Sequence, residues 1–306
     1  MVAGGDRYVL GYRPALDRLR GVAILFVVAD HVQLPLFGGA GQIGVTMFFV
    51  LSGFLITQIL LDEHRVTGRI SLLFFYARRA LRLLPALFVL LLVVSAGAVT
   101  VGDGRVLSFV PSVLLYFANW AQVGDGHAAP VLGHTWSLAI EEQFYALWPL
   151  LLILGLRWRS TGSWLPVALV AAAIGSVVMR AVIWHPTIDA YYRVVYGTDT
   201  RAEALLIGGA LAAMYATKAY RPGALITANG IALILAVLVV PSIGFFVLIG
   251  LSLVTVGACV LTALAATGRA GVLSWSWLVW LGGISYGVYL WHVPVLDAAR
   301  WVGVPG

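Results

Sequence analysis

Apolar runs separated by short polar segments fill the sequence from residue 16 onwards. A helix needs about 20 apolar residues to cross the hydrocarbon core of a bilayer, and most of the runs approach or reach that length. We therefore predict an all-α fold, a polytopic transmembrane helical bundle of about nine or ten spans. Residues 1–306 form one membrane-embedded domain in this prediction, with no soluble domain. The predicted spans are Leu16–Phe37, Ile43–Leu61, Leu83–Val101, Leu138–Leu156, Leu165–Trp184, Ala202–Ala216, Ala224–Val240, Gly244–Ala266 and Trp277–Leu296.

Arginine positions predict the orientation of the spans. The densest positive charge lies between residues 62 and 82, and Arg157 and Arg159 follow the run at 138–156. Basic residues that flank spans prefer the cytoplasmic side. Both segments can be cytoplasmic only if the short run 106–121, interrupted by Pro111, is re-entrant and does not cross. The same rule predicts a cytoplasmic amino terminus and places the Tyr-rich segment 185–201 outside the cell as a loop. We expect the protein in the inner (plasma) membrane.

Composition agrees with a membrane protein. The 306 residues are 61% hydrophobic and 10% charged, whereas soluble domains average about 25% charged residues. The net charge of +6 comes almost wholly from arginine, so we interpret it as a topology signal and expect no nucleic-acid partner. Cys259 is the only cysteine, so we expect no intrachain disulfide and no metal site built on cysteine. The first sixteen residues lack a secretory signal pattern, so we expect the first span to remain in the mature protein.

Two ionisable residues share one face of the first predicted span. Arg20 and His31 are eleven residues apart, which is three helical turns with about 20° left over. At about 1.5 Å per residue, His31 lies roughly 16 Å further into the membrane than Arg20. Ionisable side chains within a span usually mark a functional site, although a structural hydrogen bond of His31 and a topology role of Arg20 are the alternatives. We predict His31 as a proton acceptor, and Asp30 points about 100° away from it.

Four further clusters combine polar residues with apolar runs. FFVLSGFL contains Ser52 and favours close helix packing, because small residues let helices approach. FYARRALRLLP fits either a lipid and topology anchor or a phosphate-binding site, for which Arg is well suited. HTWSLAIEEQFYALWP places two carboxylates next to Trp136, where one could orient a histidine. The arginines of the second cluster are Arg78, Arg79 and Arg82, and the carboxylates of the third are Glu141 and Glu142.

The fourth cluster and the last span complete the set of candidate residues. TDTRAEALLIGGALA has Asp199, Arg201 and Glu203 at the mouth of a span, where they form either a helix cap with a surface ion pair or part of a substrate site. ISYGVYLWHVP places Tyr289 and His292 three residues apart on one helical face. An interfacial aromatic belt explains the tyrosine but not the histidine.

In their order along the chain, these motifs closely resemble the acyltransferase family 3 membrane proteins, and the resemblance covers nearly the whole sequence. It implies an integral membrane O-acyltransferase, often an acetyltransferase, that modifies carbohydrate hydroxyl groups. Polysaccharides such as lipopolysaccharide, and lipid-linked sugars, are the implied acceptors, and macrolide-type small molecules are an alternative. Such members usually continue beyond the YLWH-like segment, so this chain is either a shortened member or lacks a terminal helix. The six motifs are LDRLRGVAILFVVADH, FFVLSGFL, FYARRALRLLP, TWSLAIEEQFYALWP, DTRAEALLIG and SYGVYLWHVP.

These observations give one predicted mechanism. His31 is the general base or a transient acyl acceptor, and Glu141 or Glu142 orients its imidazole. The arginine cluster and Arg20 hold the phosphates of acyl-CoA, most simply acetyl-CoA, which is a co-substrate and not a bound cofactor. The remaining candidate residues, named at the end of this paragraph, are predicted to bind the substrate. No metal is expected. The rival class is a proton-coupled secondary transporter in which the histidine and the glutamates form a relay. These candidate substrate residues are Ser52, Trp136, Asp199, Arg201, Tyr289 and His292.

Overall fold

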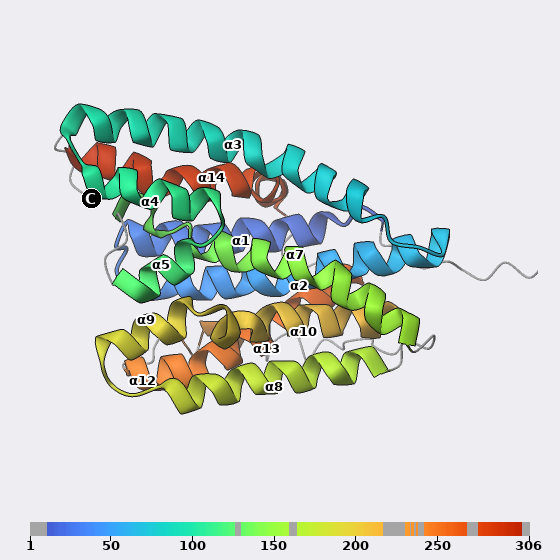
Figure 1. Ribbon diagram of the computed structural model, residues 1–306. Coiled ribbons are helices and arrows are strands. Elements are labelled where there is room, and N and C mark those ends of the chain that lie inside the picture. Colours follow the sequence, from blue (N-terminus) through green and yellow to red (C-terminus); the bar gives the residue numbers. More distant parts are fainter. Residues whose placement is uncertain are drawn as a thin grey trace, which may run out of the picture.

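The computed structural model describes residues 11–125, 130–158, 164–216, 242–267 and 275–301, together with 230–232, 234, 235 and 237. Within these residues all regular structure is helical and no strand occurs, which confirms the predicted all-α fold (Figure 1). The first helices are α1 (Pro14–His31), α2 (Ala40–Thr67), α3 (Leu72–Val101), α4 (Gly104–Leu114), α5 (Ala118–Asp125), α6 (Pro130–Gly133) and α7 (Trp136–Trp158). They are followed by α8 (Leu165–Ile183), α9 (Ile188–Tyr196), α10 (Thr198–Ala216), α12 (Ile243–Phe245), the π-helical turn η2 (Phe246–Gly250), α13 (Leu251–Ala266) and α14 (Ser276–Trp301).

Within the described residues, five helical segments are long and apolar enough to cross a membrane, so the chain is a multi-pass membrane protein. Helices α1, α10 and α14 have 18, 19 and 26 residues, lengths at which more polar helices can also cross. The total number of crossings stays a prediction, since the predicted span 224–240 lies largely outside the described residues. The five segments are Ala40–Thr67, Leu72–Val101, Val131–Arg157, Leu165–Ile183 and Ile243–Ala266.

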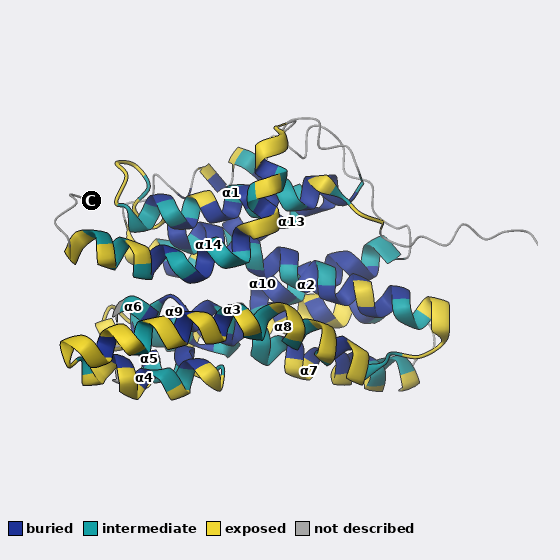
Figure 2. Ribbon diagram, turned by 90° about the horizontal axis from the view of Figure 1, so that it is seen from above, coloured by how far each residue is buried: buried dark blue, intermediate teal, exposed yellow. Residues whose placement is uncertain are grey.

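Helix α2 is the centre of the bundle. Its most apolar window is 78% buried, whereas the corresponding windows of α3 and α8 are 22% buried, and Figure 2 shows exposed residues along both of these outer helices. Close packing of α2 on α10 depends on glycine. A Cβ atom on Gly53 would collide with the Leu205 carbonyl, and one on Gly208 would collide with the Val50 carbonyl. The packing role predicted for FFVLSGFL is therefore confirmed.

The two ends of the bundle differ in what they hold. In Figure 1, α2 ends, α3 begins and α7 ends on the same side, which we call the basic end because Arg65, Arg69 and Arg157 lie there. The opposite end holds the last turn of α1 together with α4, α5 and α9. Helix α4 has 11 residues, about 16 Å, which is too short to cross a bilayer of about 30 Å. Its re-entrant character stays a prediction.

Three helix boundaries differ from the sequence prediction. Helix α1 stops at His31 and not at Phe37, because Gln33 and Leu36 have positive φ angles of 55° and 71° that a right-handed helix does not accommodate. Helix α3 starts at Leu72, so Arg78, Arg79 and Arg82, predicted for a cytoplasmic connection, lie on its first three turns. The segment predicted as a Tyr-rich loop contains α9, whose N-cap Thr187 accepts a hydrogen bond from the Ala190 amide at 3.3 Å.

Candidate active site

Four arginines from two helices meet at one cavity of about 390 Å³, which we call the arginine cavity. Arg20 comes from α1, and the other three come from the first turns of α3. The spacing predicted this grouping in part, because residues three and four apart share one helix face. The residues that line the cavity and that the sequence analysis selected are Arg20, Ser52, Arg78, Arg79, Arg82, Glu141 and Tyr289.

The four arginines differ in their partners. Arg20 lies 3.3 Å from the Asp17 carboxylate, and Arg78 lies 3.8 Å from Glu63 with most of its side chain exposed. Arg79 is held more firmly, since Nη2 is 2.7 Å from Glu142 and its guanidinium lies 3.4 Å from the centre of the Tyr145 ring. Arg82 forms no ion pair with any carboxylate in the described part of the chain. Among the described residues, Arg82 is thus the one arginine of this cavity that forms no ion pair.

The adjacent glutamates of α7 have different roles. Glu142 pairs with Arg79, as described above, and Glu141 accepts hydrogen bonds from Ser52 Oγ at 3.1 Å and from Tyr145 Oη at 3.2 Å. Adjacent helical residues point about 100° apart, which is why the two side chains reach different partners. Neither glutamate orients His31. That part of the predicted mechanism is wrong, because the His31 ring makes its hydrogen bond with the Val27 carbonyl, and both glutamates bind other residues.

A second cavity of about 470 Å³ lies at the opposite end of the bundle, and we call it the histidine cavity. Its wall combines four aromatic side chains with hydrogen-bonding groups. The aromatic rings are those of Trp136, Tyr192, Tyr196 and Tyr289. The polar groups are Asp30, His31, Gln42, Arg105, Gln122 and His134. Tyr192 and Tyr196, one turn apart on α9, stack with ring centroids 5.6 Å apart.

His31 is the last residue of α1, and its ring faces this cavity in a defined tautomer. Nδ1 lies 2.8 Å from the Val27 carbonyl oxygen. A carbonyl oxygen can only accept, so Nδ1 carries a proton, and in the neutral ring Nε2 then has the lone pair. A lone pair on a ring at a cavity wall is what a general base or a nucleophile requires.

Two further histidines surround His31. The His292 ring on α14 meets the His31 ring edge to face at a centroid distance of 4.6 Å, and His134 lies 5.1 Å from His292. His292 Nδ1 donates to the Tyr289 carbonyl at 2.6 Å, and His134 Nε2 donates to the Leu290 carbonyl at 3.1 Å. Tyr289 Oη donates to the His134 carbonyl at 2.7 Å and accepts from Ser137 Oγ at 2.5 Å. The structure thus joins the predicted residues His31, Tyr289 and His292 in one cluster.

The two cavities follow one another along α2. Gly41 and Gln42 line the histidine cavity, Val45 lines both, and the residues from Phe48 to Ile59 that continue the same face line the arginine cavity. From Gly41 to Ile59 this face is about 27 Å long, close to the roughly 30 Å of a hydrocarbon core. Tyr289 is the other residue that lines both cavities. Among the described residues, Val45 and Tyr289 therefore lie where the two cavities adjoin.

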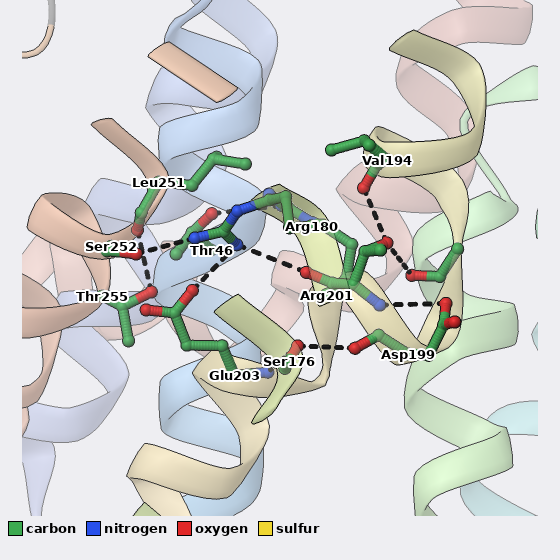
Figure 3. Close-up of polar contacts among 12 residues, drawn as sticks. Thr46, Ser176, Arg180, Val194, Asp199, Arg201, Glu203, Leu251, Ser252 and Thr255 are labelled. Atoms are coloured by element: carbon green, nitrogen blue, oxygen red, sulfur yellow. Dashed lines mark hydrogen bonds and ion pairs between the residues drawn. The ribbon is translucent and has the colours of Figure 1, made fainter. Parts of the chain in front are cut away.

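The cluster at the start of α10 is mainly structural (Figure 3). Asp199 forms two contacts with the Arg193 guanidinium, at 2.8 and 2.6 Å. Glu203 pairs with Arg180 of α8 at 2.8 Å, and both side chains are buried, so the predicted alternative of a surface ion pair is wrong for Glu203. Arg201 is also buried, and its Nη2 donates to Thr46 Oγ1 at 3.2 Å and to Gln42 Oε1 at 3.3 Å.

Several residues of the histidine cavity had no predicted role, among them His134, Tyr192, Tyr196 and Gln42. His134 is the first residue of HTWSLAIEEQFYALWP, and the position of a histidine next to a predicted span is a signal that could have identified it. Tyr192 and Tyr196 lie in the segment predicted as a loop, where the helical spacing that places them on one face was not considered. Gln42 gives no signal, because a single polar residue near the start of an apolar run is common.

Comparison with known proteins gives the family of the chain. Residues 13–300 match the family model described as an acyltransferase domain. A "putative peptidoglycan O-acetyltransferase" of Bacillus subtilis is 36% identical over 93% of this chain and 49% of its own length. The peptidoglycan O-acetyltransferase OatA of Listeria monocytogenes is 33% identical over 95% of this chain and 50% of its own. The chain thus spans about half the length of these curated relatives. No solved structure matches it significantly.

Proposed function

The chain belongs to the acyltransferase family whose model it matches, and on that premise we propose that it is a membrane O-acyltransferase. The proposed reaction moves an acyl group, most simply acetyl, from acyl-CoA to a hydroxyl group of a carbohydrate. Its relatives are named for peptidoglycan, so we propose a cell-wall glycan as the first acceptor to test rather than lipopolysaccharide. The observation that carries the proposal is the pair of cavities that follow one another along α2.

The arginine cavity is the proposed donor site. Coenzyme A carries several phosphate charges, and the planar guanidinium binds phosphate through paired hydrogen bonds. Arg82 has no ion pair in the described structure and is the first residue expected to take a phosphate. Acyl-CoA is cytoplasmic, and the positive-inside rule places the basic end of the bundle on the same side. The location of the acyl donor and the distribution of basic residues thus favour the same orientation, with the amino terminus inside the cell and the protein in the plasma membrane.

The histidine cavity is the proposed acceptor site. Stacked Tyr192 and Tyr196 provide a flat aromatic surface for a sugar ring, and Asp30 and Gln122 provide hydrogen-bonding groups for its hydroxyls. His31 Nε2 removes the proton of the acceptor hydroxyl while the hydroxyl oxygen attacks the acyl carbonyl. The C–S bond of the thioester then breaks, and the thiolate of coenzyme A takes the proton from His31. An acyl-His31 intermediate would divide the same transfer into two steps.

The rival transporter function receives no support from this arrangement. Its relay needs a glutamate beside His31, but Glu141 lines the arginine cavity and His31 lines the histidine cavity. Acylation of a macrolide-type molecule remains an alternative acceptor within the same chemistry.

The proposed function is tested with purified protein in proteoliposomes, radiolabelled acetyl-CoA and soluble peptidoglycan oligosaccharides. We expect label on the oligosaccharide with the wild type. His31→Ala should abolish transfer but retain membrane insertion and coenzyme A binding, since the histidine does not line the donor cavity. A His31→Ala variant that transfers at the wild-type rate would remove this residue from the mechanism. Label on a macrolide such as erythromycin, and on no oligosaccharide, would select the alternative acceptor.

A further inference from the structure

Arg201 is a buried cation that forms no ion pair with a carboxylate in the described part of the chain. The residue is 3% exposed. Its recorded contacts are neutral groups of α2 and the faces of Phe49 and Trp136, whose ring centres lie 5.6 and 5.7 Å from the guanidinium carbon. The nearby Glu203 carboxylate lies 2.8 Å from Arg180 (Figure 3). Two arginines therefore share one carboxylate in the described structure. An unbalanced buried charge is costly, so its retention in a membrane helix indicates a use.

The use is indicated by the group that Arg201 holds. Its Nη2 donates to Gln42 Oε1 at 3.3 Å. Arginine has no acceptor, so this contact fixes which way the Gln42 amide is turned, with its oxygen toward Arg201 and its NH₂ group away. Within the described residues the Gln42 NH₂ group donates to no acceptor. Gln42 itself lines the histidine cavity together with His31.

We propose that Gln42 is a catalytic hydrogen-bond donor for the oxygen of the acyl group, and that Arg201 is the positioning residue that orients and polarises it. This inference rests on the proposed acyl transfer. When the acceptor hydroxyl adds to the acyl carbonyl, its proton goes to His31 and the carbonyl electron pair moves to oxygen. The resulting oxyanion needs a donor that is already in place. The Gln42 amide supplies that donor, and the buried charge of Arg201 supplies a positive potential behind it.

The sharpest variant is Gln42→Glu. It keeps the size and the contact with Arg201 and provides the carboxylate that this arginine lacks, but it has no N–H to donate. If Gln42 is only structural, the variant should fold at least as well and remain active. If Gln42 stabilises the oxyanion, kcat should fall about 10²- to 10³-fold, the effect typical of losing one such donor, with the Michaelis constants for acetyl-CoA and oligosaccharide changed less than about threefold. Gln42→Met, which has similar length and also no donor, repeats the test without introducing a charge.

Rates are measured in proteoliposomes with radiolabelled acetyl-CoA and a peptidoglycan oligosaccharide, and are normalised to the fraction of protein that binds coenzyme A. Thr255→Val is the matched control. Thr255 is a buried polar residue on α13 that, among the described residues, donates its one side-chain hydrogen bond to the Leu251 carbonyl and lines neither cavity. A kcat within about threefold of the wild type in both Gln42 variants, or a rise in a Michaelis constant alone, would overturn the inference. A wild type without any transfer would overturn the proposed function itself, and the inference with it.

Discussion

Replacing Arg82 by lysine distinguishes donor binding from a topology signal. Lys and Arg count alike in the positive-inside rule, so the variant should insert normally. If Arg82 binds a phosphate of coenzyme A through two hydrogen bonds, lysine loses the second one. A hydrogen bond to a charged group contributes about 1.5 to 3 kcal/mol, and about 1.4 kcal/mol is a tenfold change in affinity.

The exposure of Arg82 decides which end of this free-energy range applies. Arg82 is solvent-exposed at the wall of its cavity, so screening reduces the effect and the lower limit applies. We expect the dissociation constant of coenzyme A to rise about tenfold in Arg82→Lys. Arg78 forms an ion pair with Glu63, and its side chain is 60% exposed. Arg78→Lys should therefore change the dissociation constant of coenzyme A less than about threefold.

The assay is isothermal titration of coenzyme A into detergent-solubilised protein, which needs no acceptor. Arg69→Lys is the control, because Arg69 is also an exposed arginine of the basic end but does not line the cavity. Equal dissociation constants for the wild type, Arg82→Lys and Arg69→Lys would return Arg82 to the anchor interpretation. Donor binding would then have to be sought around Arg20, at the other wall of the same cavity.

Two further predictions concern topology and packing. In a Cys259→Ala background, single cysteines at Gly124 and Asp189 should react with a membrane-impermeant reagent from outside the cell. Cysteines at Thr67 and Arg157 should not react. Labelling from outside at Arg157 would show that 106–121 crosses the membrane. Gly53→Ala should lower the melting temperature in detergent by several degrees, because the added methyl group meets the backbone of α10, and an unchanged value would mean that the two helices can separate without loss.

Hydropathy predicted the bundle because burial in lipid requires long apolar helices. It located α8 and the continuous segment Ile243–Ala266 within one residue at each end, but it placed the end of α2 six residues too early. It extended α1 to Phe37 because Leu34 and Leu36 continue the apolar run, although the chain turns there. Periodicity likewise placed Arg20 and His31 on one face, and each lines one of two successive cavities. Patterns along one helix thus predict which way a side chain points.

Partners on other helices were harder to predict. The sequence shows two adjacent glutamates, but only the packing of α7 against α2 and α3 decides that Glu141 meets Ser52 and Glu142 meets Arg79. The hydrogen bond that orients His31 is donated by Nδ1 to a backbone carbonyl four residues earlier, an acceptor that every helical histidine has available and that no residue pattern marks. Arg201 illustrates the same limit, since its lack of a carboxylate partner depends on Glu203 pairing with Arg180.

The division of the path along α2 into two cavities affects how such a protein can change its specificity. Among the described residues, Val45 and Tyr289 alone line both cavities, so the side chains proposed to recognise one substrate are almost entirely different from those proposed to recognise the other. Exchanging α9 between homologues, with its Tyr192 and Tyr196, would alter the histidine cavity, which is the proposed acceptor site. The exchange would leave the four arginines of the proposed donor site in place. New acceptors could thus be acquired by substitution at one end of the bundle, while a single donor chemistry is inherited unchanged at the other.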